Sequence, residues 1–346
     1  MKTSLIVIGS VIIAVLLVQL INPSMRAGTY GVLGTIFDAV GWSDGAVNMY
    51  EKSLAQFKKL DNRGGMAVAY RSLGGLYETR GTLDKAETMF NKSLAIYEEL
   101  SDKQNMLTHY GILGRIYHSR GALAEAEAMG SKSLALNESM GNQEGMAKDY
   151  GKLGTIYQSR GDLDKAEDVF NEALRLFESM RDKEGMATTY QSLGVVYLER
   201  TNLDRAEAVF KQSQDLYETL NNKANAALSY VLLGEVYRTR GELDKAEAMY
   251  KKALVIEEGI GQKEEGTAKT FSSLGEVYRT RGELDQAEAM YKNALAIEAA
   301  IGHKAGMADV YVSLGHVYHT RGEFDEAEAM YMKSLAIVEA LSLIHI

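Results

Sequence analysis

The chain has 346 residues, a formal net charge of −9, one proline and no cysteine. The lack of cysteine excludes disulfide bonds and thiolate metal sites, and the acidic balance argues against general nucleic-acid binding, which needs clustered Lys and Arg. Because 46% of the residues are apolar and proline is nearly absent, we expect a folded, mostly helical protein.

Residues 1–24 form an apolar amino-terminal segment. Residues 5–21 are almost entirely apolar and follow one basic side chain, Lys2. As a helix, this stretch would span about 25 Å, slightly less than the hydrocarbon core of a bilayer. We expect an uncleaved signal anchor in the membrane, with the remaining chain extracytoplasmic. A cleaved signal peptide, giving a secreted or periplasmic protein, and a helix packed on the following residues are the alternatives.

Residues 25–341 repeat one sequence unit eight times. A Leu-Gly pair recurs every 40 residues, and once after 41, at Leu33-Gly34, Leu73-Gly74, Leu113-Gly114, Leu153-Gly154, Leu193-Gly194, Leu233-Gly234, Leu274-Gly275 and Leu314-Gly315. Residues 233–254 and 274–295 are almost identical copies of each other. A fixed period in this range is typical of a solenoid, in which each unit buries its apolar face against its neighbours.

Each unit predicts two antiparallel helices. In residues 66–80 apolar side chains recur every three or four residues, which indicates one buried helical face. Gly81 follows and predicts a left-handed turn after the first helix, with Arg80 suited to the negative end of the helix dipole. Asp84, with Glu87 three residues later, predicts a capping box at the start of the second helix.

Small residues in both helices predict a close contact. Gly74 in the first helix and Ala86 in the second would let the two backbones approach, with aromatic side chains such as Phe90 filling the space around them. A glycine inside a helix costs about 1 kcal/mol relative to alanine. We therefore expect the close packing of the two helices to be the reason for Gly74.

The combined pattern resembles the tetratricopeptide repeat (TPR). The residues that carry the resemblance in one unit are Tyr70, Leu73, Gly74, Tyr77, Ala86, Phe90 and Ser93. The 40-residue length is similar to the lengthened repeats of kinesin light chains and Leu-Gly-Asn scaffolds. The resemblance implies an all-α, right-handed superhelical solenoid of about eight helix pairs. It also implies that the first helix of each pair lines the concave face.

Three places depart from the pattern. The first unit is divergent and contains the only tryptophan, Trp42. We interpret this unit as a terminal cap, with a partner-binding role for Trp42 as the alternative. In the third unit Ala124 replaces the capping Asp and Gly130 replaces the aromatic of the second helix, so we expect the weakest packing there. Residues 342–346 form an apolar tail outside the repeat, which we interpret as an artefact at the end of a truncated chain.

No motif for chemistry is present. The sequence has no P-loop, no Rossmann glycine pattern, no Gly-x-Ser-x-Gly elbow and no His-Glu-x-x-His. His316 and His319 stand three residues apart, but no cysteine or further histidine is placed to complete a metal site. We therefore expect no catalytic, cofactor or metal site, and no small-molecule substrate.

The predicted function is protein binding in the groove implied by the resemblance. Its candidate residues on the first helices are Arg71, Arg115, His118, Lys148, Lys152, Gln158, Gln191, Arg238, Lys269, Arg279, His316 and His319. The asparagines that line peptide grooves in several TPR proteins are absent. Because the section from Arg115 to Lys152 is basic, we expect it to bind an acidic peptide; a mixed solvated face without a dedicated ligand is the alternative.

Two functional hypotheses therefore remain open. The first is a non-enzymatic, membrane-tethered scaffold for protein partners. The second is the regulatory or sensor arm of a larger signalling enzyme, whose output domain would lie beyond the end of a truncated chain.

Overall fold

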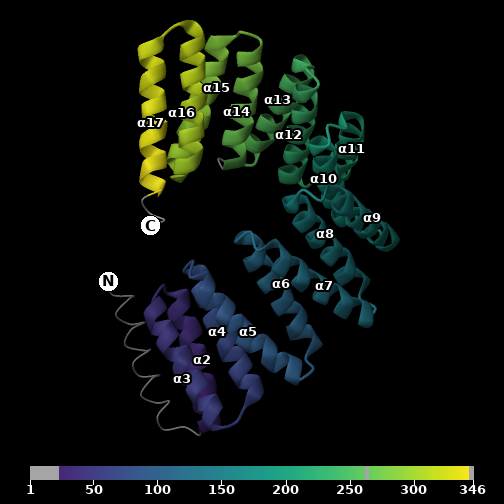
Figure 1. Ribbon diagram of the computed structural model, residues 1–346, viewed down its shortest axis with the longest axis vertical. Coiled ribbons are helices and arrows are strands. Elements are labelled where there is room, and N and C mark those ends of the chain that lie inside the picture. The colour runs from purple at the N-terminus through teal and green to yellow at the C-terminus, as the bar shows by residue number, and fades with distance from the viewer. Residues whose placement is uncertain (1–22, 262–264, 343–346) are drawn as a thin grey trace. The chain divides into compact units, whose positions relative to one another are not determined.

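The computed structural model describes residues 23–261 and 265–342, and in these ranges it contains sixteen α-helices and no strand (Figure 1). The helices are α2 (Pro23–Ala39), α3 (Ser43–Lys59), α4 (Arg63–Thr79), α5 (Leu83–Glu99), α6 (Lys103–Ser119), α7 (Leu123–Ser139), α8 (Gln143–Arg160), α9 (Leu163–Met180), α10 (Lys183–Glu199), α11 (Leu203–Thr219), α12 (Lys223–Thr239), α13 (Leu243–Gly259), α14 (Glu265–Thr280), α15 (Leu284–Ile301), α16 (Lys304–Arg321) and α17 (Phe324–Ser342). The all-α prediction is confirmed.

The helices belong to two compact units. The described part of the first unit, residues 23–162, contains α2 to α8, and that of the second, residues 163–342, contains α9 to α17. Within each unit every helix packs against the next one in the chain, as the repeat predicts. First helices of successive repeats are also in contact: α2 contacts α4, and α10 contacts α12. The right-handed superhelix stays a prediction.

The predictions for the two ends of the chain fall mostly on residues outside the described ranges. The apolar segment 5–21, with its anchor and signal-peptide alternatives, lies outside the described residues, and so do residues 343–346 of the tail. Among the helices of residues 23–261 and 265–342, none has the length and hydropathy needed to cross a bilayer.

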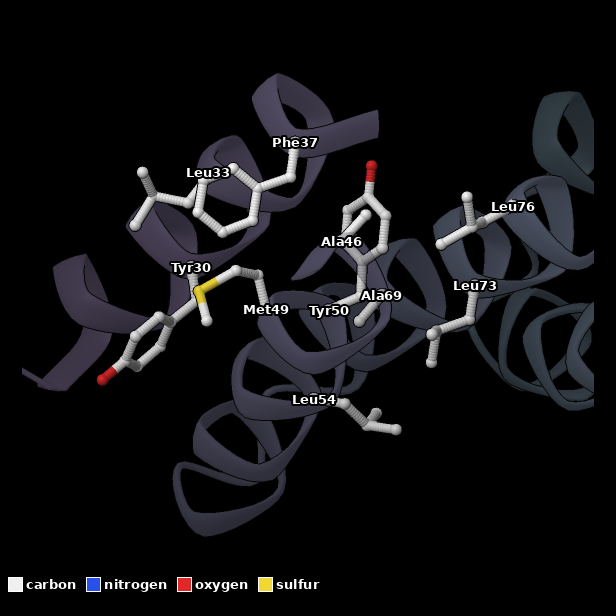
Figure 2. Packing of buried hydrophobic residues seen from close by; sticks show 10 residues of the cluster. All are labelled: Tyr30, Leu33, Phe37, Ala46, Met49, Tyr50, Leu54, Ala69, Leu73 and Leu76. Carbon is white, nitrogen blue, oxygen red and sulfur yellow. The ribbon is translucent and has the colours of Figure 1, made fainter. Parts of the chain in front are cut away.

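Neighbouring repeats share one apolar core. Figure 2 shows this for the first two repeats, where side chains from three helices meet. Tyr30 and Leu33 come from α2, Tyr50 from α3, and Leu73 and Leu76 from α4, and all five are at least nine-tenths buried. One helix pair alone would leave part of this apolar surface in water, so burial couples each repeat to the next.

In six of the described repeats, the glycine of the Leu-Gly pair lies against an aromatic ring from the second helix. A Cβ built on Gly194 would lie 2.3 Å from a carbon of the Phe210 ring, and one built on Gly234 would lie 2.6 Å from the Tyr250 ring. Any side chain at these positions would displace a fully buried ring. The predicted close contact is therefore confirmed, and the ring is what requires the glycine.

The turns between helices also follow the prediction. Gly81 adopts φ +70°, in the left-handed region that glycine tolerates best. The fifth repeat has Thr201 at this position, and it adopts φ +56°. The divergent first repeat keeps the same turn through Gly41, with φ +77°.

The predicted capping box is wrong. Asp84 is the second residue of α5, and Thr82 before the helix makes no side-chain cap. Asp84 and Glu87 instead project from one helical face and bind Arg120 of the next repeat. The guanidinium nitrogens lie 2.7 Å from Asp84 Oδ1 and 2.5 Å from Glu87 Oε2, and the Tyr117 hydroxyl donates to Glu87 over 3.0 Å.

This group of one Arg, one Tyr and two acids, the inter-repeat clamp, recurs along the chain. The same contacts join Arg200 to Asp164 and Glu167, Arg240 to Asp204 and Glu207, Arg281 to Asp244 and Glu247, and Arg321 to Asp285 and Glu288. In the third repeat, where Ala124 replaces the Asp, Arg160 binds Glu127 and the carbonyl of Leu123. The Asp and Glu that recur at this spacing therefore join each repeat to the next one and do not cap their own helices.

The clamps predict a loss of stability in acid. Burial alone would raise the pKa of Glu207, but hydrogen bonds from Lys211, Arg240 and Tyr237 lower it to about 2. The pKa values of Glu247 and Glu288 fall to about 2 in the same way. Since these folded-state values lie below the ordinary 4.5, the stabilisation is complete above pH 4.5 and is lost as the pH falls towards 2.

We expect each of the three glutamates to contribute about 2–3 kcal/mol of this acid-labile stability. The measurement is urea unfolding of the full chain at several pH values between 7 and 2. Replacing all three with Gln should lower stability at pH 7 and flatten its fall below pH 4.5, whereas Gln at the exposed Glu258 should change neither. An unchanged acid profile in the triple variant would contradict this role.

Candidate protein-binding surface

All twelve predicted groove residues lie on first helices. Arg71 is on α4, Arg115 and His118 are on α6, and Lys148, Lys152 and Gln158 are on α8; Gln191 is on α10, Arg238 on α12, Lys269 and Arg279 on α14, and His316 and His319 on α16. Their helical assignment follows the prediction. Their binding role is a separate matter, which depends on what each side chain contacts.

The section from Arg115 to Lys152 is not uniformly basic, because each of its cations lies beside a carboxylate. Arg115 Nη1 is 2.5 Å from Glu78, Lys148 Nζ is 2.5 Å from Glu144, and Lys152 Nζ is 3.1 Å from Asp149. The three cationic side chains remain more than half exposed. They form a hydrated, charge-balanced strip.

Several predicted groove residues connect successive repeats. The His118 ring nitrogen lies 2.9 Å from Ser159 Oγ, which joins α6 to α8. Gln191 of α10 donates to Ser229 Oγ of α12 over 3.0 Å. These side chains therefore help to set the spacing of the first helices, which is a structural role that the sequence did not reveal.

In the sixth and seventh repeats, the predicted cations are held by acids on their own helices. Arg238 lies 2.7 Å from Glu235, which also accepts a hydrogen bond from Tyr250 over 2.6 Å. Arg279 and Glu276 form the same pair, 2.5 Å apart, in the next repeat. Burial and these partners make both arginines structural members of a polar network.

The two histidines of α16 contact different aromatic side chains. The His316 ring meets Tyr331 edge-on with centroids 5.7 Å apart, and the His319 ring meets Phe324 in the same way at 5.4 Å. In the first repeat, Trp42 is 56% exposed and its ring packs on Phe37 at 4.6 Å.

A hollow of about 520 Å³ opens between α6, α7 and α8 in the first unit. Its walls are mainly apolar and include Leu107, Ile112 and Ile156, whereas Arg115 and Lys152 lie at its rim. Its lining also contains His118, so it brings together three of the predicted groove residues. The volume lies in the range of protein sites for small ligands and anchoring side chains.

The hollow exists because of Gly130, which lies in its lining. Other repeats place an aromatic ring here, between the Leu-Gly glycine and the leucine of the next repeat. In the third repeat, the nearest side-chain atom to a Cβ built on Gly114 is Met129 Cβ, at 3.5 Å. The predicted weak packing therefore takes the form of an open, apolar space.

A buried carboxylate that the sequence analysis missed forms one side of the hollow. Asp149 is 2% exposed, and its Oδ2 accepts hydrogen bonds from Ser133 over 2.6 Å and from Asn137 over 2.7 Å. Its Oδ1 faces Lys152. The sequence did carry a signal, because no other repeat has an acid at this position: the residues there are Thr29, Ala69, His109, Thr189, Ser229, Thr270 and Val310.

Comparison with known families decides the assignment. The sequence matches the MalT-like TPR region over residues 14–186 and the tetratricopeptide repeat over residues 185–258 and 266–340. The chain belongs to the tetratricopeptide repeat family. No curated protein sequence matches it.

Solved structures of other TPR-like proteins share the fold. The apo quorum sensor NprR from B. thuringiensis has a TM-score of 0.63 and 16% identity, over 92% of this chain and 89% of its own. A STAND signal-transduction ATPase with a TPR sensor, from Pyrococcus horikoshii, has the same score and identity, over 92% of this chain and 49% of its own. BtubC from P. vanneervenii has a TM-score of 0.58 and 22% identity, over 64% and 92%. At these identities, the likeness concerns the fold alone.

Proposed function

We propose that this TPR protein is a non-catalytic scaffold that binds segments of partner proteins across the first helices of its repeats. The observation that carries the proposal is the hollow in the first unit, an open apolar space with exposed cationic side chains at its rim. Such a space can anchor one apolar side chain, while the surrounding polar groups contact the rest of a peptide.

An acidic segment fits the rim best. Arg115 and Lys152 at the rim, and Lys148 elsewhere on α8, are exposed and already hold carboxylates of the chain itself. A partner's carboxylates can accept hydrogen bonds from the N–H donors of these cations that the chain's own carboxylates do not use. Binding should therefore weaken as salt screens these exposed pairs.

The test is peptide-array binding by the full chain, followed by titration of the best segments in solution. Replacing Arg115, Lys148 and Lys152 together with Gln should weaken binding about tenfold, because each exposed charge contact contributes about 0.2–1 kcal/mol. Lys52→Gln, an exposed cation on the second helix α3, is the matched control and should leave affinity unchanged. Equal losses in both variants, or no bound segment at all, would reject the proposal.

Gln rather than Glu is the useful replacement at Lys152. A glutamate there would place a second carboxylate against the buried Asp149 and disturb folding as well as binding.

A regulatory arm of a signalling enzyme is the second candidate. It is supported by the shared fold of the STAND protein's TPR sensor and of the quorum sensor NprR, each matched over 92% of this chain. Sequencing the full gene and assaying a signalling enzyme, encoded with it or bound to it, with and without a bound segment separates the candidates. A change in enzyme output supports the regulatory arm, and an unchanged output supports the scaffold.

A membrane tether for the scaffold is part of the proposal. It rests on the apolar composition of residues 5–21. Mass measurement of the mature amino terminus and carbonate extraction of membranes test it: an intact terminus that stays with the membrane supports an anchor, and a processed, released chain supports a signal peptide.

A further inference from the structure

The hollow has the location of a missing ring. In the second repeat the Phe90 ring lies on Gly74, with ring atoms 2.9 Å from the position of a Cβ, and the Tyr291 ring lies on Gly275 in the same way. Gly130 stands at the corresponding sequence position of the third repeat. Gly114 therefore presents a flat helix surface of the kind that supports a ring elsewhere, but no ring of the third repeat covers it.

The tyrosines at this position show where the far end of such a ring points. The Tyr250 hydroxyl donates to Glu235 over 2.6 Å, and the Tyr291 hydroxyl donates to Glu276 over 3.0 Å. Tyr50 likewise lies 3.2 Å from the hydroxyl of Thr35. In each case, the partner is the residue directly after the Leu-Gly pair. In the third repeat, that residue is Arg115.

We propose that the hollow binds the tyrosine side chain of a peptide, whose ring takes the missing place on Gly114 and whose phenol oxygen accepts a hydrogen bond from Arg115. This inference rests on the proposed function, since a bound segment supplies the ring. Arg115 uses Nη1 for Glu78, and a guanidinium has five N–H donors in all. Phenylalanine would fill the same space but would offer the guanidinium no further hydrogen-bond acceptor.

Lys152 adds a second contact. Its Nζ lies 3.9 Å from the position of a Cβ on Gly111, so the ammonium extends across the surface of α6 beside the hollow. There it can approach the face of an inserted ring, as Lys252 approaches the Tyr230 ring in the second unit, at 5.3 Å from its centroid.

The first experiment uses p-cresol, the tyrosine side chain alone, and toluene as its counterpart without the hydroxyl. Both are titrated into the full chain, with chemical shifts of residues lining the hollow as the readout. We expect p-cresol to bind in the roughly millimolar range that a few buried atoms provide. Gly130→Tyr adds the chain's own ring beside the hollow once the Leu153 side chain, 2.8 Å from the new Cβ, shifts, and binding should fall at least about tenfold. No binding to the wild type, or equal binding to Gly130→Tyr, would overturn the proposal.

Arg115→Met tests the polar contact and concerns an exposed side chain, so the variant should fold even if Gly130→Tyr does not. It should lower the ratio of p-cresol to toluene affinity about tenfold, as expected for one hydrogen bond to a charged group. Lys269→Met, on a first helix of the second unit, is the control and should leave the ratio unchanged. An unchanged ratio in Arg115→Met would remove Arg115 from the site.

The second experiment separates this inference from the proposed function. The best acidic peptide from the array is compared with versions that carry Tyr, Phe or Ala at one position. A preference for Tyr that Gly130→Tyr abolishes supports the site. Peptide binding that is indifferent to both changes would retain the scaffold and reject the ring site. Binding of p-cresol without binding of any peptide would retain the ring site and reject the peptide as its source.

Discussion

Replacing Gly194 with Ala should destabilise the second unit by about 2 kcal/mol. The new Cβ would lie 2.3 Å from a carbon of the Phe210 ring, which is fully buried, so the ring or the helix must shift. Overpacking of this kind costs about 1–3 kcal/mol or more, and the gain in helix propensity from alanine returns at most about 1 kcal/mol. Urea unfolding followed by circular dichroism measures the difference.

Gly114→Ala is the matched control, at the same position of the third repeat. Its Cβ would meet Met129 Cβ at 3.5 Å, an ordinary contact, because no ring covers this glycine. We therefore expect a stabilisation of up to about 1 kcal/mol from helix propensity. Similar destabilisation by both substitutions would show that the glycines are required by the helix backbone rather than by the ring.

Asp149→Ala should destabilise the first unit by about 3 kcal/mol. The change removes the acceptor of both Ser133 and Asn137, which are buried and would be left with unpaired donors. Leaving buried polar groups unsatisfied costs about 1–3 kcal/mol each. Thermal and urea unfolding of the full chain report the loss.

Asp84→Ala provides the comparison for Asp149. Its carboxylate also accepts from another repeat, through Arg120, but its side chain is 97% exposed, so the change should cost no more than about 0.5 kcal/mol. Asp149→Asn should cost less than the alanine change, because Ser133 and Asn137 both donate to Oδ2 and an amide oxygen can also accept two bonds. If Asp149→Ala and Asp84→Ala cost the same, burial of the Asp149 network would not be the source of its stability.

The helix pairs could be predicted because apolar side chains that recur every three or four residues can be buried together only on one face of a helix. The apolar spacing, the glycines at turns such as Gly81 and the small residues at the helix contact all indicated the same structure. The capping box failed because Asp84 and Glu87 also share one helical face. The same spacing therefore suits a cap on their own helix or a pair of acceptors for another repeat, and only the packing of the next first helix distinguishes the two.

The candidate surface was predicted less completely. The helix of each groove residue follows from the repeat, but the pairing of Arg115 with Glu78 depends on how two successive first helices align. Asp149 was missed because a lone acid on an amphipathic helix is ordinarily solvated. Its burial depends on Ser133 and Asn137, which lie on the preceding helix α7. Gly130 did indicate the weak point, although not that the space would be open and adjacent to Arg115.

The inter-repeat clamp makes each repeat complementary to a copy of itself. The arginine and tyrosine stand at the end of the first helix, and the two acids stand at the start of the second, so every intact unit carries both halves of one joint. Tandem duplication of such a unit creates a matched junction at once, without any compensating mutation. A recent tandem duplication would produce neighbouring units that are nearly identical in sequence, as residues 233–254 and 274–295 are.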